Sequence, residues 1–464
     1  MHLVSYLNNL TKYIIICRLY YNNYYINIKE FKLNFIKRKI LPHISIFLNY
    51  KEAIVIYGAR QVGKTTIIKM LIEELKSVNI PDGAIFYFDL EDLEMLELCN
   101  QGVDYVIRYM GARTSYNPGN PSNSSASSKG KIYLFIDEIQ YLNNASSFIK
   151  LMVDNHSDRF KLIVSGSSVL DIKSKIKQSL VGRIVTFEVL GLDFEEFLWF
   201  KKKTFDLDKI TDADKKTPKE LKQLFEEFII FGAYPRIALI SEIKDRRYYL
   251  KELIQTYIKK DIRDIGKIRN IMKFNNFLRI LADQVGNLLN IDELASSIGI
   301  AKETVYDYLI LLEGTYIARR LTPFFKNLRS ELTKMPKIYF EDSGILNYLK
   351  YNEIVEKVSD GLFENSIYTE LRKAVGLEEL RYWRTQSKQE IDFVIDHKRQ
   401  LFTLEVKKIY SGQKTTSLEY FSQKYPNSKS FIITLEKRRE AKGDISLIYP
   451  WEINKKLQIA RPKV

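Results

Sequence analysis

A glycine-rich segment between two apolar runs has the composition of a phosphate-binding loop. Residues 58–65 are GARQVGKT and match the pattern GxxxxGK[ST], in which glycines let backbone N–H groups face a phosphate. In this pattern Lys64 reaches the β- and γ-phosphates, and Thr65 holds Mg²⁺ through its hydroxyl. The residues expected to contact the bound nucleotide are Gly58, Ala59, Arg60, Gln61, Val62, Gly63, Lys64, Thr65 and Thr66.

Two adjacent acids, Asp137 and Glu138, follow another apolar run, IYLFI at 132–136. The first acid would bind Mg²⁺ through water, as a second metal ligand beside Thr65. The second would orient and deprotonate the attacking water, with Lys64 as the other catalytic residue. The alternative is that both acids cap a following helix. Together, the loop and the acids predict hydrolysis of a nucleoside triphosphate, with ATP and Mg²⁺ bound.

Two further residues would complete such a site. Ser165 follows the apolar run 162–164, where its hydroxyl would contact the γ-phosphate or the attacking water. Ordinary turn chemistry is the alternative. Arg183 precedes another expected strand and is a candidate arginine finger, acting within the chain or from a neighbouring subunit. A lone arginine is also a common surface cation.

Four apolar runs must position these residues, and they cover 53–57, 85–88, 132–136 and 162–164. The spacing after the loop predicts a helix over 67–72. Strands that alternate with helices imply a parallel sheet covered on both faces, so the fold class is α/β. A stretch rich in Gly, Ser, Pro and Asn at about 111–130 predicts a mobile surface insertion.

A helix-turn-helix is expected further along the chain. Residues 291–295 predict a helix that stops at Gly299, and 301–312 predict a second helix three residues on. The aromatic and basic segment 317–329 has the composition of a wing. This arrangement serves either to contact DNA or only to pack against the rest of the protein.

The charges on this element do not decide between the two roles. The second helix carries Glu303 and Asp307, and acids are unfavourable on a surface that faces phosphates. Arg319 and Arg320 in the expected wing would compensate for them.

A second group of charged residues lies near the carboxyl terminus. If the two apolar segments there form a hairpin that pairs Ile395 with Phe402, Asp392 lies opposite Glu405, with Lys407 on the same face. Opposed carboxylates repel, so a divalent ion beside the lysine would account for the grouping. This D…ExK pattern is that of restriction-type nucleases, in which acids hold Mg²⁺ and the lysine orients water. The alternative is an amphipathic hairpin with a solvated charged face.

The order of these motifs resembles that of bacterial and archaeal AAA-type ATPases with a winged helix and a carboxyl-terminal restriction-endonuclease-like domain. The resemblance spans about residue 35 to the end. It implies a P-loop NTPase core with a helical lid, and it implies that Glu364 joins Asp392 and Glu405 in a second metal site. The motifs that carry it are GARQVGKTT (58–66), LFIDEIQ (134–140), SGSS (165–168), GR (182–183), FEEFL (194–198), FGAYPR (231–236), YIKKDIRDI (257–265), GLFENSIYTEL (361–371), YWR (382–384), EIDFVI (390–395) and LEVKK (404–408).

The expected architecture is therefore an AAA-like parallel-sheet core followed by smaller modules. The expected domains are an extension of unknown role (1–28), the P-loop core (29–200), a polar linker and helical lid (201–270), a winged helix-turn-helix (271–330) and an α/β restriction-endonuclease-like domain (331–464).

Composition gives weaker indications about partners and location. Lys and Arg number 72 against 57 Asp and Glu, a net charge of +15 that favours a polyanionic partner such as DNA. A bias toward Lys, Ile, Asn and Tyr, as in an AT-rich genome, would produce the same excess. Two cysteines are too few for a disulfide framework. No apolar run is long enough to span a membrane, and no signal peptide is evident, so we expect a cytoplasmic protein.

Three functions remain open from the sequence. The first is an ATPase acting on DNA or regulated by it. The second is a slow ATP-dependent switch that binds a protein partner and carries an inactive nuclease-like domain. The third is a Mg²⁺-dependent nuclease regulated by ATP. The sequence is compatible with a homo-oligomer.

Overall fold

The computed structural model describes residues 35–114, 130–167, 180–210, 217–256, 268, 270–324, 335–441 and 443–458. Several expected features lie outside the described residues. They are the extension at 1–28, most of the insertion at about 111–130, the motif at 257–265 and the end of the expected wing at 325–329.

A five-stranded parallel sheet forms in the first half of the chain, with the strand order β2-β3-β4-β1-β5. Its strands are β1 (Ala53–Gly58), β2 (Ile85–Asp89), β3 (Ile132–Asp137), β4 (Phe160–Gly166) and β5 (Ile184–Val189). Strands β1, β3 and β4 are buried along their whole length, as expected for the central strands of a parallel sheet. The four expected strands and the α/β class are confirmed.

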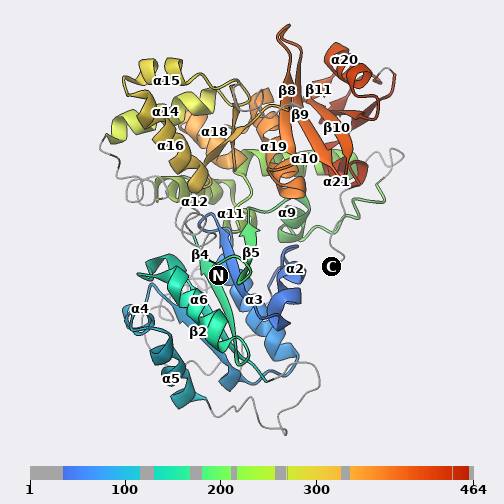
Figure 1. Ribbon diagram of the computed structural model, residues 1–464. Coiled ribbons are helices and arrows are strands. Elements are labelled where there is room, and N and C mark those ends of the chain that lie inside the picture. Colours follow the sequence, from blue (N-terminus) through green and yellow to red (C-terminus); the bar gives the residue numbers. More distant parts are fainter. Residues whose placement is uncertain are drawn as a thin grey trace, which may run out of the picture. The chain divides into compact units, whose positions relative to one another are not determined.

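Helices precede, connect and follow these strands. They are α2 (Leu41–Ser45), α3 (Lys64–Ser77), α4 (Leu93–Asn100), α5 (Val103–Arg113), α6 (Ala145–His156) and α9 (Phe194–Phe200). Helix α3 contacts β1 and β4, and α6 contacts β4 (Figure 1). The helix expected over 67–72 is present and is longer, because it begins directly after Gly63, whose φ of 99° suits glycine.

A group of helices follows the sheet. They are α10 (Thr217–Phe231), α11 (Pro235–Leu239), α12 (Ile243–Thr256), α14 (Ile271–Asp283) and α18 (Ser343–Tyr351). Helix α18 contacts α10, α12 and α14. Within the described ranges, no helix is both long enough and apolar enough to cross a bilayer.

The two helices expected around Gly299 are present as α15 (Ile291–Ile298) and α16 (Lys302–Gly314). The φ of 68° at Gly299 ends α15, where a side chain would be strained. After α16, strand β6 (Ala318–Leu321) pairs antiparallel with β7 (Lys337–Phe340).

A second five-stranded sheet, of mixed direction, forms in the last part of the chain with the order β14-β12-β10-β9-β8. The elements here are α19 (Asp360–Val375), β8 (Leu380–Arg384), β9 (Glu390–His397), β10 (Gln400–Val406), β11 (Ile409–Tyr410), α20 (Thr416–Lys424), β12 (Lys429–Ile433), β13 (Glu436–Lys437), β14 (Ile445–Ile448) and α21 (Ile453–Lys456). Ile395 pairs with Phe402, so the predicted hairpin register is confirmed. Helix α19 contacts β8, β9 and β10.

Candidate functional site

The glycine-rich loop joins the carboxyl end of β1 to the amino end of α3. A Cβ on Gly58 would lie 2.0 Å from the carbonyl oxygen of Val189, so only glycine fits there. Lys64 begins α3 and is 5% exposed. Its ammonium lies back across the loop, donating to the carbonyls of Gly58 (3.2 Å) and Ala59 (2.8 Å). The loop therefore curves around this ammonium, next to the positive end of the α3 dipole.

Asp137, at the carboxyl end of β3, is buried and accepts hydrogen bonds from three hydroxyls. The Thr65 hydroxyl lies 2.6 Å from one carboxylate oxygen, and the Tyr87 hydroxyl lies 3.1 Å from the same oxygen. Ser165, at the end of β4, donates to the other oxygen. Burial and then the neighbouring carboxylates, Asp137 first, raise the pKa of Tyr87 well above its usual value. The tyrosine therefore remains a proton donor to Asp137.

Ser165 contacts the acid predicted to bind metal, whereas the sequence predicted that it contacts the γ-phosphate or the attacking water. That prediction stays untested. Tyr87 was missed altogether. A signal was present, because Tyr87 and Asp89 are two residues apart on β2 and so share a face, and Asp89 pairs with Asp137.

The Glu138 carboxylate is held by two polar side chains. Ser167 donates to it through its hydroxyl at 3.0 Å, and the Gln140 amide donates to the same oxygen. Gln140 also bonds the Ser167 hydroxyl at 3.0 Å, which closes a ring of three side chains. Gln140 and Ser167 were not predicted as site residues, although both lie in the quoted motifs at 134–140 and 165–168.

The helix-capping alternative for these acids is wrong. Glu138 precedes a short 3₁₀ helix, Ile139–Tyr141, and makes no capping hydrogen bond through its side chain. The next α-helix, α6, is capped by Asn144, whose side chain accepts from the Ser147 N–H.

Arg183 lies at the opposite edge of the sheet from the loop. Ala53, the first residue of β1, pairs with Ile184, so Arg183 lies beside the amino ends of the strands. Strand β1 has six residues, which places the loop roughly 17 Å away at the rise of a β-strand. Arg183 pairs instead with Asp154 at 2.6 Å. Action within the same chain is therefore wrong, and action from a neighbouring subunit stays a prediction.

The hairpin β9–β10 brings the carboxyl-terminal acids together. The Val406 N–H donates to Asp392 at 2.8 Å, and the Lys407 ammonium lies 2.7 Å from Glu405. On α19, Glu364 accepts from the Tyr339 hydroxyl at 2.7 Å. Burial and then the Asp392 carboxylate raise the pKa of Glu364 to about 8 and that of Glu405 to about 7.

A buried lysine that sequence reasoning missed lies beside these acids. The Lys337 ammonium, on β7, is 2.6 Å from Glu390 and 4.0 Å from Asp392. Burial lowers the pKa of Lys337, but the Asp392 and Glu364 carboxylates outweigh this effect and raise it. Nothing around this lone lysine in the sequence indicated such a role.

The second metal site expected at Glu364, Asp392 and Glu405 stays a prediction. Across the described ranges, no three acidic, histidine or cysteine side chains are arranged to hold a metal ion. Lys337 and Lys407 supply positive charge beside these acids, through ion pairs with Glu390 and Glu405.

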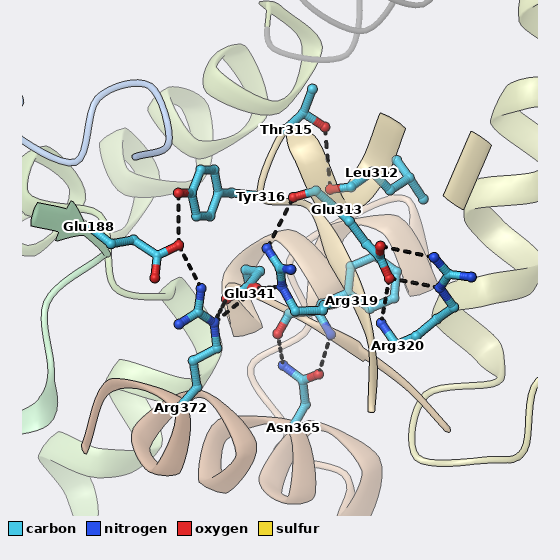
Figure 2. Close-up of polar contacts among 11 residues, drawn as sticks. Glu188, Leu312, Glu313, Thr315, Tyr316, Arg319, Arg320, Glu341, Asn365 and Arg372 are labelled. Atoms are coloured by element: carbon cyan, nitrogen blue, oxygen red, sulfur yellow. Dashed lines mark hydrogen bonds and ion pairs between the residues drawn. The ribbon is translucent and has the colours of Figure 1, made fainter. Parts of the chain in front are cut away.

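The two arginines of the expected wing are paired with acids (Figure 2). Arg320 binds Glu313 through two nitrogens, at 2.8 and 3.0 Å. Arg319 lies 2.8 Å from Glu341. Both arginines are already paired with Glu313 and Glu341, so neither is paired with Glu303 or Asp307, the two acids for which they were expected to compensate.

A second set of contacts in Figure 2 joins the first sheet to later elements. Glu188 on β5 pairs with Tyr57, the residue before Gly58, in the strand register. Its carboxylate accepts from the Tyr316 hydroxyl at 2.9 Å and from Arg372 on α19 at 3.0 Å. The strand beside β1 is therefore tied to α19 and to the segment after α16.

A family model described as an AAA domain matches residues 50–198. Two further family models, each described as a domain of unknown function (DUF8612 and DUF4143), match residues 222–355 and 359–453.

Similar proteins come from archaea and bacteria. The uncharacterized protein MJ1544 of Methanocaldococcus jannaschii is 28% identical over 367 residues, covering 77% of this chain and 76% of that protein. The uncharacterized protein Rv2008c of Mycobacterium tuberculosis is 22% identical, covering 68% of this chain and 64% of its own length. Among solved structures, the Walker-type ATPase PABY2304 of Pyrococcus abyssi aligns with a TM-score of 0.42 and 15% identity, covering 70% of this chain and 99% of that one.

Proposed function

We propose that this chain binds ATP at residues 58–66 and hydrolyses it with Glu138 as the general base. The observation that carries the proposal is the 2.6 Å hydrogen bond between the Thr65 hydroxyl and the Asp137 carboxylate. It brings the two expected metal ligands, one from α3 and one from β3, to a single point beside the loop. The AAA domain match over 50–198 supports the same assignment.

The residues present fit Mg²⁺ and a triphosphate. Thr65 and Asp137 offer oxygen ligands, which Mg²⁺ prefers, and Mg²⁺ would neutralise charge on the phosphate oxygens. The curved loop offers backbone N–H groups, and Lys64 contributes a buried positive charge beside them. Glu138 follows Asp137 directly and would accept the proton of the attacking water.

We further propose that turnover is slow and that the chain acts as an ATP-dependent switch. Two donors hold one oxygen of the Glu138 carboxylate, so fewer acceptor positions remain for the attacking water. A partner that releases Gln140 or Ser167 from Glu138 would therefore raise the rate. The pairing of Arg319 and Arg320 with acids favours a protein partner over DNA at this element.

Substitution of the loop lysine tests the ATPase assignment. Lys64→Ala should abolish ATP turnover, measured as phosphate release, because the buried charge that faces the phosphates is lost. Lys69→Ala removes an exposed lysine from the same helix and should leave turnover unchanged. Chelation of Mg²⁺ with EDTA should stop turnover of the unmodified chain. Equal turnover in Lys64→Ala and Lys69→Ala would refute the proposal.

Titration with DNA tests the choice of partner. We expect ATP turnover to be indifferent to single- and double-stranded DNA at both low and moderate salt. Stimulation that weakens as salt rises would indicate phosphate contacts and would replace the protein partner with DNA.

A further inference from the structure

We propose that Arg38 is a positioning residue that sets the orientation of the peptide between Val62 and Gly63 in the phosphate loop. The inference rests on the ATP-binding function proposed above and adds a residue outside the motif. The Arg38 side chain is 6% exposed and belongs to the segment that precedes β1.

Each nitrogen of the Arg38 guanidinium contacts a different part of the chain. Nη1 donates to the Val62 carbonyl at 2.8 Å, in the loop itself. Nη2 donates to the Leu190 carbonyl at 3.0 Å, directly after β5, and Nε donates to Glu196 of α9 at 3.1 Å. One planar, rigid group therefore fixes the loop relative to two other elements.

The contact with the Val62 carbonyl determines where the next N–H points. The described peptide bonds are trans, and in a planar trans peptide the carbonyl and the N–H point in opposite directions. Because the Val62 carbonyl faces Arg38, the N–H of Gly63 faces away from it. Gly63 has a φ of 99°, which other residues rarely adopt. Arg38 thereby holds one phosphate-binding N–H in place before ATP arrives.

The acid that holds Arg38 is itself fixed. Glu196 and Asp193 form a reciprocal capping box at the start of α9, in which the Glu196 N–H donates to Asp193 at 2.8 Å. The main-chain N–H of Lys39 also donates to Glu196 at 2.8 Å. The Glu196 carboxylate therefore has little freedom to move with the Arg38 guanidinium, and it holds that guanidinium in one place.

Arg246 provides a matched control for the loss of stability that follows when a buried, hydrogen-bonded arginine is replaced. It is also 6% exposed, and it donates to the Ile240 and Ser241 carbonyls and to Glu227, at 2.6, 3.0 and 2.6 Å. It therefore makes the same set of bonds as Arg38, two to carbonyls and one to a glutamate, on a helix that does not contribute to the phosphate loop.

The test measures the dissociation constants of Mg·ATP and ADP for the unmodified chain, Arg38→Lys and Arg246→Lys. We expect Arg38→Lys to weaken both nucleotides about tenfold, the value of one lost charge-assisted hydrogen bond. The KM for ATP should rise in parallel while kcat at saturating ATP changes by less than about twofold. Arg246→Lys should bind both nucleotides as the unmodified chain does. Equal affinities in the two variants would overturn the inference.

Two other outcomes are also decisive. If the unmodified chain does not bind ATP, the proposed function fails and this inference falls with it. If Arg38→Lys does not fold, Glu196→Gln is compared with Glu227→Gln, since both keep the arginine and neutralise its partner. Weaker ATP binding in Glu196→Gln alone would support the positioning role, and equal binding in the two would overturn it.

Discussion

At the scale of single residues, the hydrogen-bonded ring of Glu138, Gln140 and Ser167 is expected to limit the rate of ATP turnover. Gln140→Ala removes one donor to the Glu138 carboxylate and should leave an acceptor position on it open to the attacking water, raising turnover on the order of 3–10-fold. The measurement is phosphate release at saturating ATP. Asn143→Ala, a change at an exposed residue three positions after Gln140, is the control. Turnover in Gln140→Ala at or below that of the control would show that the ring does not restrain the base.

At the scale of elements, strand β4 carries a fully buried lysine that makes stability depend on pH. Lys161 donates to the carbonyls of Tyr50 (3.1 Å) and Glu52 (2.5 Å), just before β1. Burial lowers the pKa of Lys161 from 10.5 to about 7. Between pH 7 and 10.5 the unfolded chain therefore binds more protons at this site than the folded chain does. The contribution of Lys161 to the unfolding free energy is therefore greatest above pH 10.5 and falls as the pH decreases toward 7.

Lys161→Met should remove this dependence. We expect the rise in unfolding free energy between pH 7 and 10, roughly 3–5 kcal/mol from this group, to disappear in urea denaturation of the variant. Lys51→Met, an exposed lysine nearby, should keep the rise. The same pH slope in both variants would contradict the lowered pKa.

The elements that sequence predicted well are those with local signals. Apolar runs that end at Gly58, Asp137 and Ser165 predicted the first sheet, because the carboxyl ends of parallel strands meet at one edge. Two apolar segments, 391–395 and 401–406, separated by a polar stretch, similarly predicted the register of the carboxyl-terminal hairpin. The same logic excludes Arg183 from its own nucleotide site, because a residue before a parallel strand lies at the opposite edge.

Contacts between distant segments were not predictable in this way. Arg38 contacts Val62 and Glu196, and Lys337 contacts Glu390. Each contact is made by a single buried charged residue, and no repeating pattern in the sequence marks such a residue. From sequence alone, a charged residue is expected at the surface unless its partner is known. Such partners become visible only when the chain is folded.

At the scale of the whole molecule, Glu188 joins the first sheet to the later modules, and its contacts can be measured as a coupling. Tyr316→Phe removes one hydroxyl donor to Glu188 and should cost about 1–2 kcal/mol of stability. Glu188→Gln should cost more, about 2–4 kcal/mol, because Arg372 is 3% exposed and loses a charged partner. In denaturant unfolding, the double variant should be less destabilised than the sum of the two by about 1 kcal/mol. Additive losses would mean that the Tyr316 hydroxyl and Glu188 do not interact.

The central claim, that Glu138 hydrolyses ATP bound beside Lys64 and Asp137, is tested most directly by the nucleotide that remains on the protein. Glu138→Gln keeps the shape of the site but lacks the base, so a single turnover with labelled Mg·ATP should leave bound ATP in the variant and bound ADP in the unmodified chain. ADP appearing on Glu138→Gln at the rate of the unmodified chain would contradict the assignment.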